Sequence, residues 1–153
     1  MPSFRTSRRV KHPAKEMFAL VADVEAYPEF VPMCQRLTLR KRDTDENGRE
    51  RLVAEMEVGY KAIRERFTSR VTLEPEAMRI EVEYLDGPFR RLHNTWGFVD
   101  EAEPGCSRVE FSIDYEFKSR TLGLLMGAMF DQAFRRFAHA FEERADKVYG
   151  RRA

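Results

Sequence analysis

One amphipathic stretch at the C-terminus constrains the fold more than any other part of the sequence. Between Ser119 and Tyr149 the apolar residues recur at steps of three and four: Leu122, Leu125, Met126, Met129, Phe130, Ala133, Phe134, Phe137, Ala138, Phe141, Ala145 and Val148. This spacing predicts an α-helix with one apolar face, and charged residues such as Arg136 and Glu143 occupy the other. At about 1.5 Å per residue the helix would be roughly 45 Å long. The rest of the chain must therefore supply a surface that covers this face.

The middle of the chain shows the alternating pattern typical of β-strands. After a short basic strand from Phe4 to Val10, His12-Pro13 opens a helix, and one more short helix fits before Pro32. Alternating runs then follow over residues 37–39, 52–60, 63–73, 78–84, 92–98 and 109–117. Short polar turns between them indicate antiparallel neighbours with one apolar face. We predict a single α+β domain over residues 1–153, in which a curved antiparallel sheet of about seven strands wraps around the C-terminal helix.

Composition limits the compartment and the partners. The 27 Lys and Arg residues nearly balance 26 Asp and Glu residues, and a net charge of +1 argues against DNA as a partner. The N-terminus is polar from the start, and the longest apolar run, Leu122 to Phe130, is far shorter than the roughly 20 residues of a membrane span. Cys34 and Cys106 are too few for a disulfide framework. We expect a cytoplasmic protein with reduced thiols that can still contact a membrane surface; the sequence does not specify an oligomeric state.

The histidines and cysteines do not form a catalytic or metal-binding pattern. His12, His93 and His139 are far apart, and no CxxC, HxxxH or H-x-E spacing occurs. A Cys34 nucleophile would lack a histidine partner in the sequence. We therefore predict no metal site and no catalytic residue. A catalytic alternative would have to use Glu65 with a tyrosine as its acid–base group.

Aromatic and sulfur-containing side chains dominate the inward faces predicted for the sheet and the helix. In the strands they are Tyr60, Phe67, Tyr84, Phe89, Trp96, Phe98, Phe111 and Tyr115, and in the helix they are Met126, Met129, Phe130, Phe134, Phe137 and Phe141. This set fits an ordinary filled core, but a curved sheet around one helix can also enclose a cavity for a flexible apolar ligand. Three polar residues also fall on inward-facing positions of the strands: Glu65, Ser69 and Asn94. Each is either a polar handle for a ligand or a solvated residue at the margin of the sheet.

Two glycines, Gly123 and Gly127, interrupt the start of the C-terminal helix. Each costs about 1 kcal/mol relative to alanine inside a helix. They fit either close packing of helix on sheet with a frayed first turn, or a flexible apolar lip that opens a cavity or dips into a lipid surface. Leu124 lies away from the apolar stripe in both cases.

Basic residues gather at two places on the predicted surface. Arg64, Arg66 and Arg70 share a wet face with Glu55, Glu57, Glu81 and Glu83, so we interpret them as cross-strand ion pairs. A second group near the chain ends has no acidic residue among its members: Arg5, Arg8, Arg9, Lys11, Arg151 and Arg152. This second group could contact RNA, although a plain solvated surface also accounts for it.

Three segments of the chain resemble a known family. They are YPEFVPMC (residues 27–34), DGPFRRL (residues 86–92) followed by Trp96 and Phe98, and FEERADKVYG (residues 141–150). Together they resemble the START-like coenzyme Q-binding proteins of the polyketide cyclase/dehydrase and lipid-transport superfamily, a group that includes bacterial ribosome-association toxins. The resemblance covers nearly the whole chain in the same order of elements. Met33 departs from it, since relatives often carry tryptophan there.

The resemblance implies a helix-grip fold and a hydrophobic cavity that binds ubiquinone or a related isoprenoid lipid, without turnover and with no required cofactor. It implies a role in respiratory electron transport or quinone biosynthesis, with peripheral contact at the inner face of the bacterial inner membrane. Inhibition of translation through association with the ribosome is one alternative, and a polyketide aromatase/cyclase is a second. The candidate lining residues are Tyr60, Phe67, Tyr84, Phe89, Trp96, Phe111, Met126, Met129, Phe130 and Phe134, with Glu65 and Asn94 as polar handles. These assignments depend on strand phase, and Phe89 and Leu92 can both point inward only if a β-bulge separates them.

Overall fold

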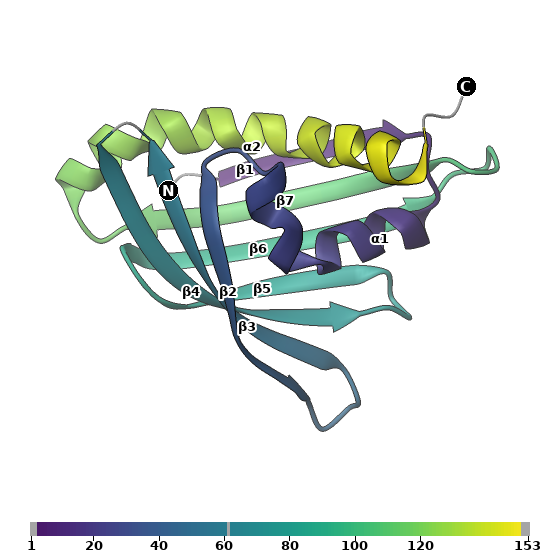
Figure 1. Ribbon diagram of the computed structural model, residues 1–153, viewed down its shortest axis with the longest axis horizontal. Coiled ribbons are helices and arrows are strands. Elements are labelled where there is room, and N and C mark those ends of the chain that lie inside the picture. Colours follow the sequence, from purple (N-terminus) through teal and green to yellow (C-terminus); the bar gives the residue numbers. More distant parts are fainter. Residues whose placement is uncertain (1–2, 61, 151–153) are drawn as a thin grey trace.

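Seven strands form one antiparallel sheet, and a 30-residue helix, α2, runs along its inner face (Figure 1). The computed structural model describes residues 3–60 and 62–150, except for the side chain of Tyr60. The strand order across the sheet is β1-β7-β6-β5-β4-β3-β2. The elements are β1 (Ser3–Val10), α1 (Ala14–Ala22), the 3₁₀-helix η1 (Val24–Glu29), β2 (Cys34–Thr44), β3 (Glu50–Tyr60), β4 (Ile63–Glu74), β5 (Arg79–Asp86), β6 (Phe89–Asp100), β7 (Ser107–Phe117) and α2 (Arg120–Tyr149). The predicted helix-grip architecture is confirmed.

Both ends of α2 carry capping residues. Ser119 is the N-cap, and its side chain accepts a hydrogen bond from the Leu122 N–H at 3.1 Å. Gly150 ends the helix with φ +91°, a conformation that glycine adopts without strain. Between these caps the buried side chains are Met126, Phe130, Ala133, Phe134, Ala138, Phe141 and Ala145. Leu125 is the main exception to the predicted stripe, because it lies five positions before Phe130, about 140° away around the helix, and is exposed.

A buried histidine joins the two ends of the chain. His12 is fully buried, and its Nε2 lies 2.8 Å from Oδ1 of Asp146 near the end of α2. The Ser107 hydroxyl of β7 donates to the His12 carbonyl at 2.7 Å. The sequence pattern could not reveal this contact, because its partners are 134 residues apart. It holds the C-terminal half of α2 against β7 and the start of α1.

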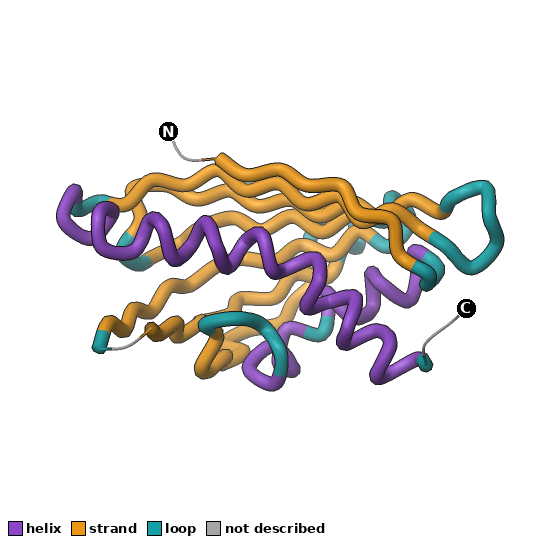
Figure 2. Tube along the Cα trace, turned by 90° about the horizontal axis from the view of Figure 1, so that it is seen from above, coloured by secondary structure: helices purple, strands orange, loops and turns teal. Residues whose placement is uncertain are grey.

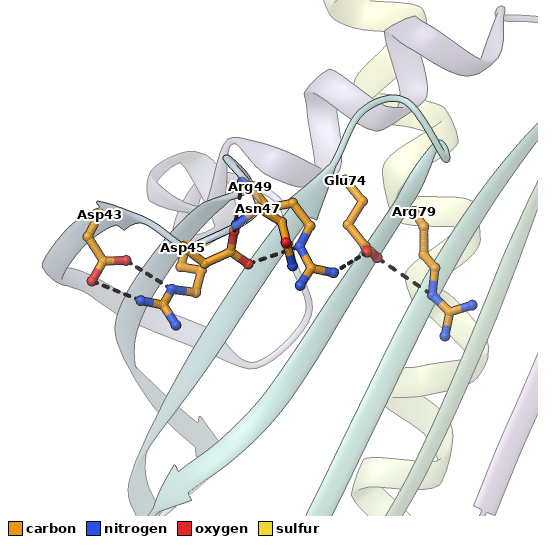
Figure 3. A network of polar contacts seen from close by, with 7 residues as sticks. Asp43, Asp45, Asn47, Arg49, Glu74 and Arg79 are labelled. Carbon is orange, nitrogen blue, oxygen red and sulfur yellow. Dashed lines mark hydrogen bonds and ion pairs between the residues drawn. The ribbon is translucent and has the colours of Figure 1, made fainter.

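Charged residues on the outer surface pair across the strands. Figure 3 shows one such network, in which Arg49 bridges Asp45 at 2.9 Å and Glu74 at 2.8 Å and so ties the β2–β3 turn to β4. Backbone N–H groups of Arg49 and Asn47 also donate to Asp45, and these contacts lower the pKa of its carboxyl. The network stabilises the far end of the sheet and lies outside its apolar interior.

The predicted basic stripe is a solvated face, as expected. Arg66 lies 4.0 Å from Glu57, and Arg70 lies 4.0 Å from Glu83. The basic group near the N-terminus is partly neutralised as well, because Arg8 pairs with Glu142 at 2.6 Å and Arg9 pairs with Glu103. Arg151 and Arg152 lie outside the described residues. Neither group presents an uninterrupted field of positive charge.

Candidate functional site

A cavity of about 120 Å³ lies between the sheet and α2. Its walls come from η1 and the segment after it, from β2 to β7, and from α2. The helix contributes Phe130, Ala133, Phe134, Phe137 and Phe141. The opposite wall is built mainly from aliphatic side chains, which include Val71, Ile80, Val82, Leu92 and Ile113. The interior is therefore neither fully packed nor polar, and its chemistry suits an apolar ligand.

Seven of the residues predicted from strand and helix phase lie on this cavity. They are Phe67, Phe89, Asn94, Trp96, Phe111, Phe130 and Phe134. For Asn94, Trp96 and Phe111 the agreement follows from the regular alternation of β6 and β7, where every second residue from Leu92 to Phe98 and from Val109 to Phe117 is buried.

Four other predicted residues do not line the cavity. Met126 is fully buried, but it lies one turn before Phe130, where the helix wall of the cavity begins. Met129 is only partly buried, because it sits about 100° around the helix from Phe130. Tyr84 lies behind Phe89, with ring centroids 5.6 Å apart, and Glu65 is partly exposed near the start of β4. The side chain of Tyr60 lies outside the described residues.

The predicted β-bulge at the start of β6 is present. The register between β6 and β7 shifts between Phe89 and Arg91, which places both Phe89 and Leu92 inside. Phe89 is fully buried and stacks on Phe117 at 4.8 Å and on Phe130 at 5.8 Å. The Tyr84 hydroxyl accepts the Phe89 N–H at 3.0 Å and secures the bulge. This bulge therefore connects the cavity wall to the first third of α2.

Trp96 is held in one orientation by Asn94. The Trp96 Nε1–H donates to the Asn94 side-chain oxygen at 3.1 Å, and the Asn94 amide donates to the Ser112 carbonyl at 2.8 Å. Edge contacts to Phe111 at 4.7 Å and Phe141 at 5.1 Å fix the ring from two further sides. An Asn side chain has two donors and two acceptor positions, so Asn94 keeps one N–H and one lone pair for another partner.

Ser69 is the unpartnered polar group of the cavity. It lies on β4, its side chain is 6% exposed, and its Oγ has no hydrogen-bond partner among the described residues. Buried hydroxyls almost always find a partner, and leaving one unsatisfied costs about 1–3 kcal/mol. Ser69 therefore offers a donor and an acceptor to whatever occupies the cavity.

The segment after α1 supplies lining residues that the hydrophobic period of the sequence did not predict. Tyr27, Val31 and Met33 reach the cavity from η1 and the turn that follows. A 3₁₀-helix and a turn have no long period to detect, so only the YPEFVPMC resemblance marked this segment. Met33 has φ +69°, a left-handed conformation that is strained for methionine.

The ionisable groups beside the cavity do not form a nucleophile. Burial raises the pKa of the Cys34 thiol to about 11, against a smaller lowering by a hydrogen bond with the Arg36 backbone. The Tyr27 hydroxyl donates to the Val21 carbonyl, and burial raises its pKa as well. Both groups stay protonated at neutral pH. Among the described side chains, no three His, Cys, Asp or Glu residues meet in a way that could hold a metal ion.

The two glycines in the first turns of α2 make no close contact with the strands. A Cβ at Gly123 would meet Phe117 at 3.7 Å, an ordinary contact, and a Cβ at Gly127 would meet nothing within 4 Å. The glycines are therefore not required by close packing of helix on sheet. None of the described helices has the length and hydropathy needed to span a bilayer.

Comparison with known proteins gives consistent matches over nearly the whole chain. The family model described as polyketide cyclase/dehydrase and lipid transport matches residues 10–142. The mitochondrial coenzyme Q-binding protein COQ10 of Dictyostelium discoideum is 33% identical over 94% of this chain and 69% of its own length. The ribosome association toxin RatA of Vibrio cholerae is 33% identical over 98% of this chain and 99% of its own length. These matches confirm the predicted resemblance.

Solved structures agree with the fold. The 18 kDa protein CC1736 from Caulobacter crescentus is 34% identical, with a TM-score of 0.79 over 99% of this chain and 100% of that protein. The ZhuI aromatase/cyclase from Streptomyces sp. R1128 has a TM-score of 0.79 over 95% of this chain and 94% of its own, at 15% identity. At that identity the second match concerns the fold alone.

Proposed function

The chain belongs to the polyketide cyclase/dehydrase and lipid transport family, and on that basis we propose that it binds ubiquinone or a related isoprenoid lipid without turning it over. It would act as a carrier or chaperone at the inner face of the bacterial inner membrane, in support of respiratory electron transport or quinone biosynthesis. One observation carries the proposal: an apolar cavity between sheet and helix contains a buried, unpartnered hydroxyl, that of Ser69. The relative named as coenzyme Q-binding supports the choice of ligand.

The size of the cavity fits a ring rather than a whole lipid. Its volume is about 120 Å³, and an apolar cavity of about 150 Å³ is enough to bind benzene. Typical pockets for larger ligands measure about 300–1,000 Å³. A quinone ring would occupy the existing space against Trp96 and Phe111. The isoprenoid tail would need a path that opens when the first turns of α2 move away from Phe117.

The polar groups of the cavity suit a carbonyl ligand. The Ser69 hydroxyl would donate to one carbonyl oxygen of the ring, and the remaining Asn94 N–H would be available to another acceptor. Burial of the apolar remainder would supply most of the affinity, at about 25 cal/mol per Å² before ordering costs.

A binding role is favoured over catalysis by the ionisable groups near the cavity. Glu65, the candidate acid–base group for a cyclase, does not line the cavity. Cys34 has a pKa of about 11, so its thiolate is scarce at neutral pH. General acid–base catalysis works best with a group that titrates near the operating pH. The protein would thus hold its ligand and release it unchanged.

Two measurements test this function. The first is mass spectrometry of lipid that copurifies with the protein from a bacterial membrane extract, where we expect a quinone. The second is titration with a short-tailed ubiquinone: Ser69→Ala should weaken binding by roughly 2–10-fold through loss of one hydrogen bond. Ser112→Ala, on the opposite face of the sheet, is the matched control and should bind like the wild type. Wild-type protein that neither carries nor binds a quinone would contradict the proposal.

Association with the ribosome is the second candidate. The specific observation in its favour is that the toxin RatA of Vibrio cholerae matches over 99% of its own length. The pairing of Arg8 and Arg9 with acidic residues weakens a purely electrostatic contact. Cosedimentation with large ribosomal subunits at physiological salt would support this function, and complete loss of association in modest salt would reduce it to charge attraction.

A further inference from the structure

The start of α2 exposes two leucines side by side. Leu124 is 80% exposed and Leu125 is 58% exposed, more than the other exposed large hydrophobic residues, Leu85, Val99 and Val148. Figure 1 shows these first turns at the end of α2 that lies away from α1, and Figure 2 shows them at the end of the sheet. A single exposed leucine needs no explanation, but two adjacent ones at a free helix end form an apolar tip.

The charges around this tip have one dominant sign. Lys118 and Arg120 precede the leucines, both are exposed, and within the described residues neither forms an ion pair. The sequence from Phe117 to Phe130 contains no Asp or Glu. Cations at the N-terminus of a helix oppose its dipole, and the first turn of α2 lacks the acidic residue that would favour it. These cations therefore cost stability where they stand, which indicates a role in contact with an anionic surface.

The neighbouring turn extends the basic surface. The Lys118 N–H donates to the Pro88 carbonyl at 2.9 Å, so the start of β6 lies beside the start of α2. Arg90 and Arg91 are exposed there, and of these only Arg90 forms an ion pair within the described residues, with Glu116 at 3.5 Å. With Lys118 and Arg120 this makes four cations against two carboxylates, Asp86 and Glu116. Leu85, which is 43% exposed, adds a third apolar side chain to this end of the molecule.

We propose that this surface docks on an anionic phospholipid bilayer, with Leu124 and Leu125 inserted among the acyl chains and Lys118, Arg120 and Arg91 at the headgroups. Exposed leucines close to unpaired cations match the two layers of such a membrane, apolar chains below anionic headgroups. A second copy of the chain would bring the same cations together and repel itself.

The docked face adjoins the cavity. Phe117, which precedes the tip, stacks on Phe89, and Phe89 and Phe130 both line the cavity. Docking would therefore place the movable turns of α2 at the point where a lipid leaves the bilayer. This part of the inference rests on the proposed quinone site, whereas docking itself does not require a ligand in the cavity.

Flotation with quinone-free vesicles tests the inference. Wild-type protein should float with vesicles of phosphatidylcholine containing phosphatidylglycerol, bind phosphatidylcholine alone much more weakly, and lose part of its binding in high salt. The double variant Leu124→Glu and Leu125→Glu should bind the anionic vesicles about tenfold or more weakly. Lys118→Glu combined with Arg120→Glu should do the same. Val148→Glu, an exposed aliphatic residue at the other end of α2, is the matched control and should bind like the wild type.

Three outcomes would overturn the inference: no binding of the wild type to anionic vesicles, wild-type binding by the leucine double variant, or a dimer in sedimentation velocity that this variant alone dissociates. The last outcome would show that the exposed leucines at the start of α2 form a contact with a second copy of the chain. Thermal stabilisation by a short-tailed ubiquinone, measured on the same variants without vesicles, separates the two proposals. Vesicle binding without any effect of quinone would remove the quinone function and leave docking intact.

Discussion

Gly87, in the turn between β5 and β6, is a single residue on which both the fold and the cavity depend. Its φ is +145°, and a Cβ there would lie 2.6 Å from the Cβ and 2.9 Å from the Cα of Phe67, which lines the cavity. Gly87→Ala should therefore lower the free energy of unfolding by about 1–3 kcal/mol, measured by urea denaturation. Gly48→Ala, at φ +80° with no atom near the added methyl, is the control for backbone strain alone. Equal losses in the two variants would show that the contact with Phe67 does not matter.

The buried Cys34 thiol makes stability depend on pH in the alkaline range. Burial raises its pKa from 9.0 to about 11, and burial also raises the pKa of the Tyr27 hydroxyl. The folded protein holds these protons more tightly than the unfolded chain, so the stabilisation is fully present below pH 9 and is lost as pH rises through about 11. Urea midpoints should fall between pH 9 and pH 11. The fall should be shallower when Cys34→Ala and Tyr27→Phe are combined, and an unchanged slope would assign it to other groups.

The hydrophobic period of the strands and of α2 identifies some cavity-lining residues correctly and fails for others. Trp96 and Phe111 could be placed on the cavity because β6 and β7 alternate without interruption over those positions. Met129 and Tyr84 could not be excluded from the predicted lining. The apolar face of a helix is broader than the part of it that meets the cavity, and a strand extends beyond the end of the cavity. Ser69 was one of three polar residues predicted to face inward. Only the structure distinguishes it, by showing that its hydroxyl has no hydrogen-bond partner among the described residues.

At the scale of elements, the glycines of α2 allow a test of the proposal that its first turns move to admit the isoprenoid tail. Gly123→Ala combined with Gly127→Ala should stabilise the helix by up to about 1 kcal/mol per substitution, since neither methyl would clash. The same change should slow the entry of a long-tailed quinone, followed by quenching of Trp96 fluorescence in a stopped-flow instrument. Entry of a tail-less quinone is the control and should keep its rate. A stabilised variant with unchanged rates for both ligands would contradict the role of these turns as an entrance.

The elements themselves were predictable to different degrees. The long period of α2 and the strict alternation of the strands specify both the layers and their contact faces. The bulge after Phe89 was predictable because two apolar residues three apart cannot otherwise share a face of a strand. A short helix before Pro32 was predictable too, but the place of the segment from η1 to Met33 on the cavity was not. Tertiary contacts hold this segment, such as the hydrogen bond from the Gly59 N–H to the Met33 carbonyl at 3.0 Å.

At the scale of the whole molecule, the architecture follows from the sequence but the volume of its interior does not. A sheet with one apolar face and a helix with one apolar stripe have few ways to cover each other. Whether side chains fill the space between them depends on rotamers and on differences of a few atoms in volume. The cavity of about 120 Å³ that Ala133 lines depends on such small differences in side-chain volume, and the proposed function depends on the cavity.

Filling this space tests the central claim most directly. Ala133 lines the cavity, so Ala133→Leu should occupy much of it and leave stability equal or higher, whereas Ala140→Leu, away from the cavity on the same helix, is the control. We expect a short-tailed ubiquinone to raise the melting temperature of the wild type and of Ala140→Leu, because a ligand that binds only the folded state stabilises it. We expect no rise for Ala133→Leu. An equal rise in all three proteins, or none in the wild type, would contradict binding in the cavity.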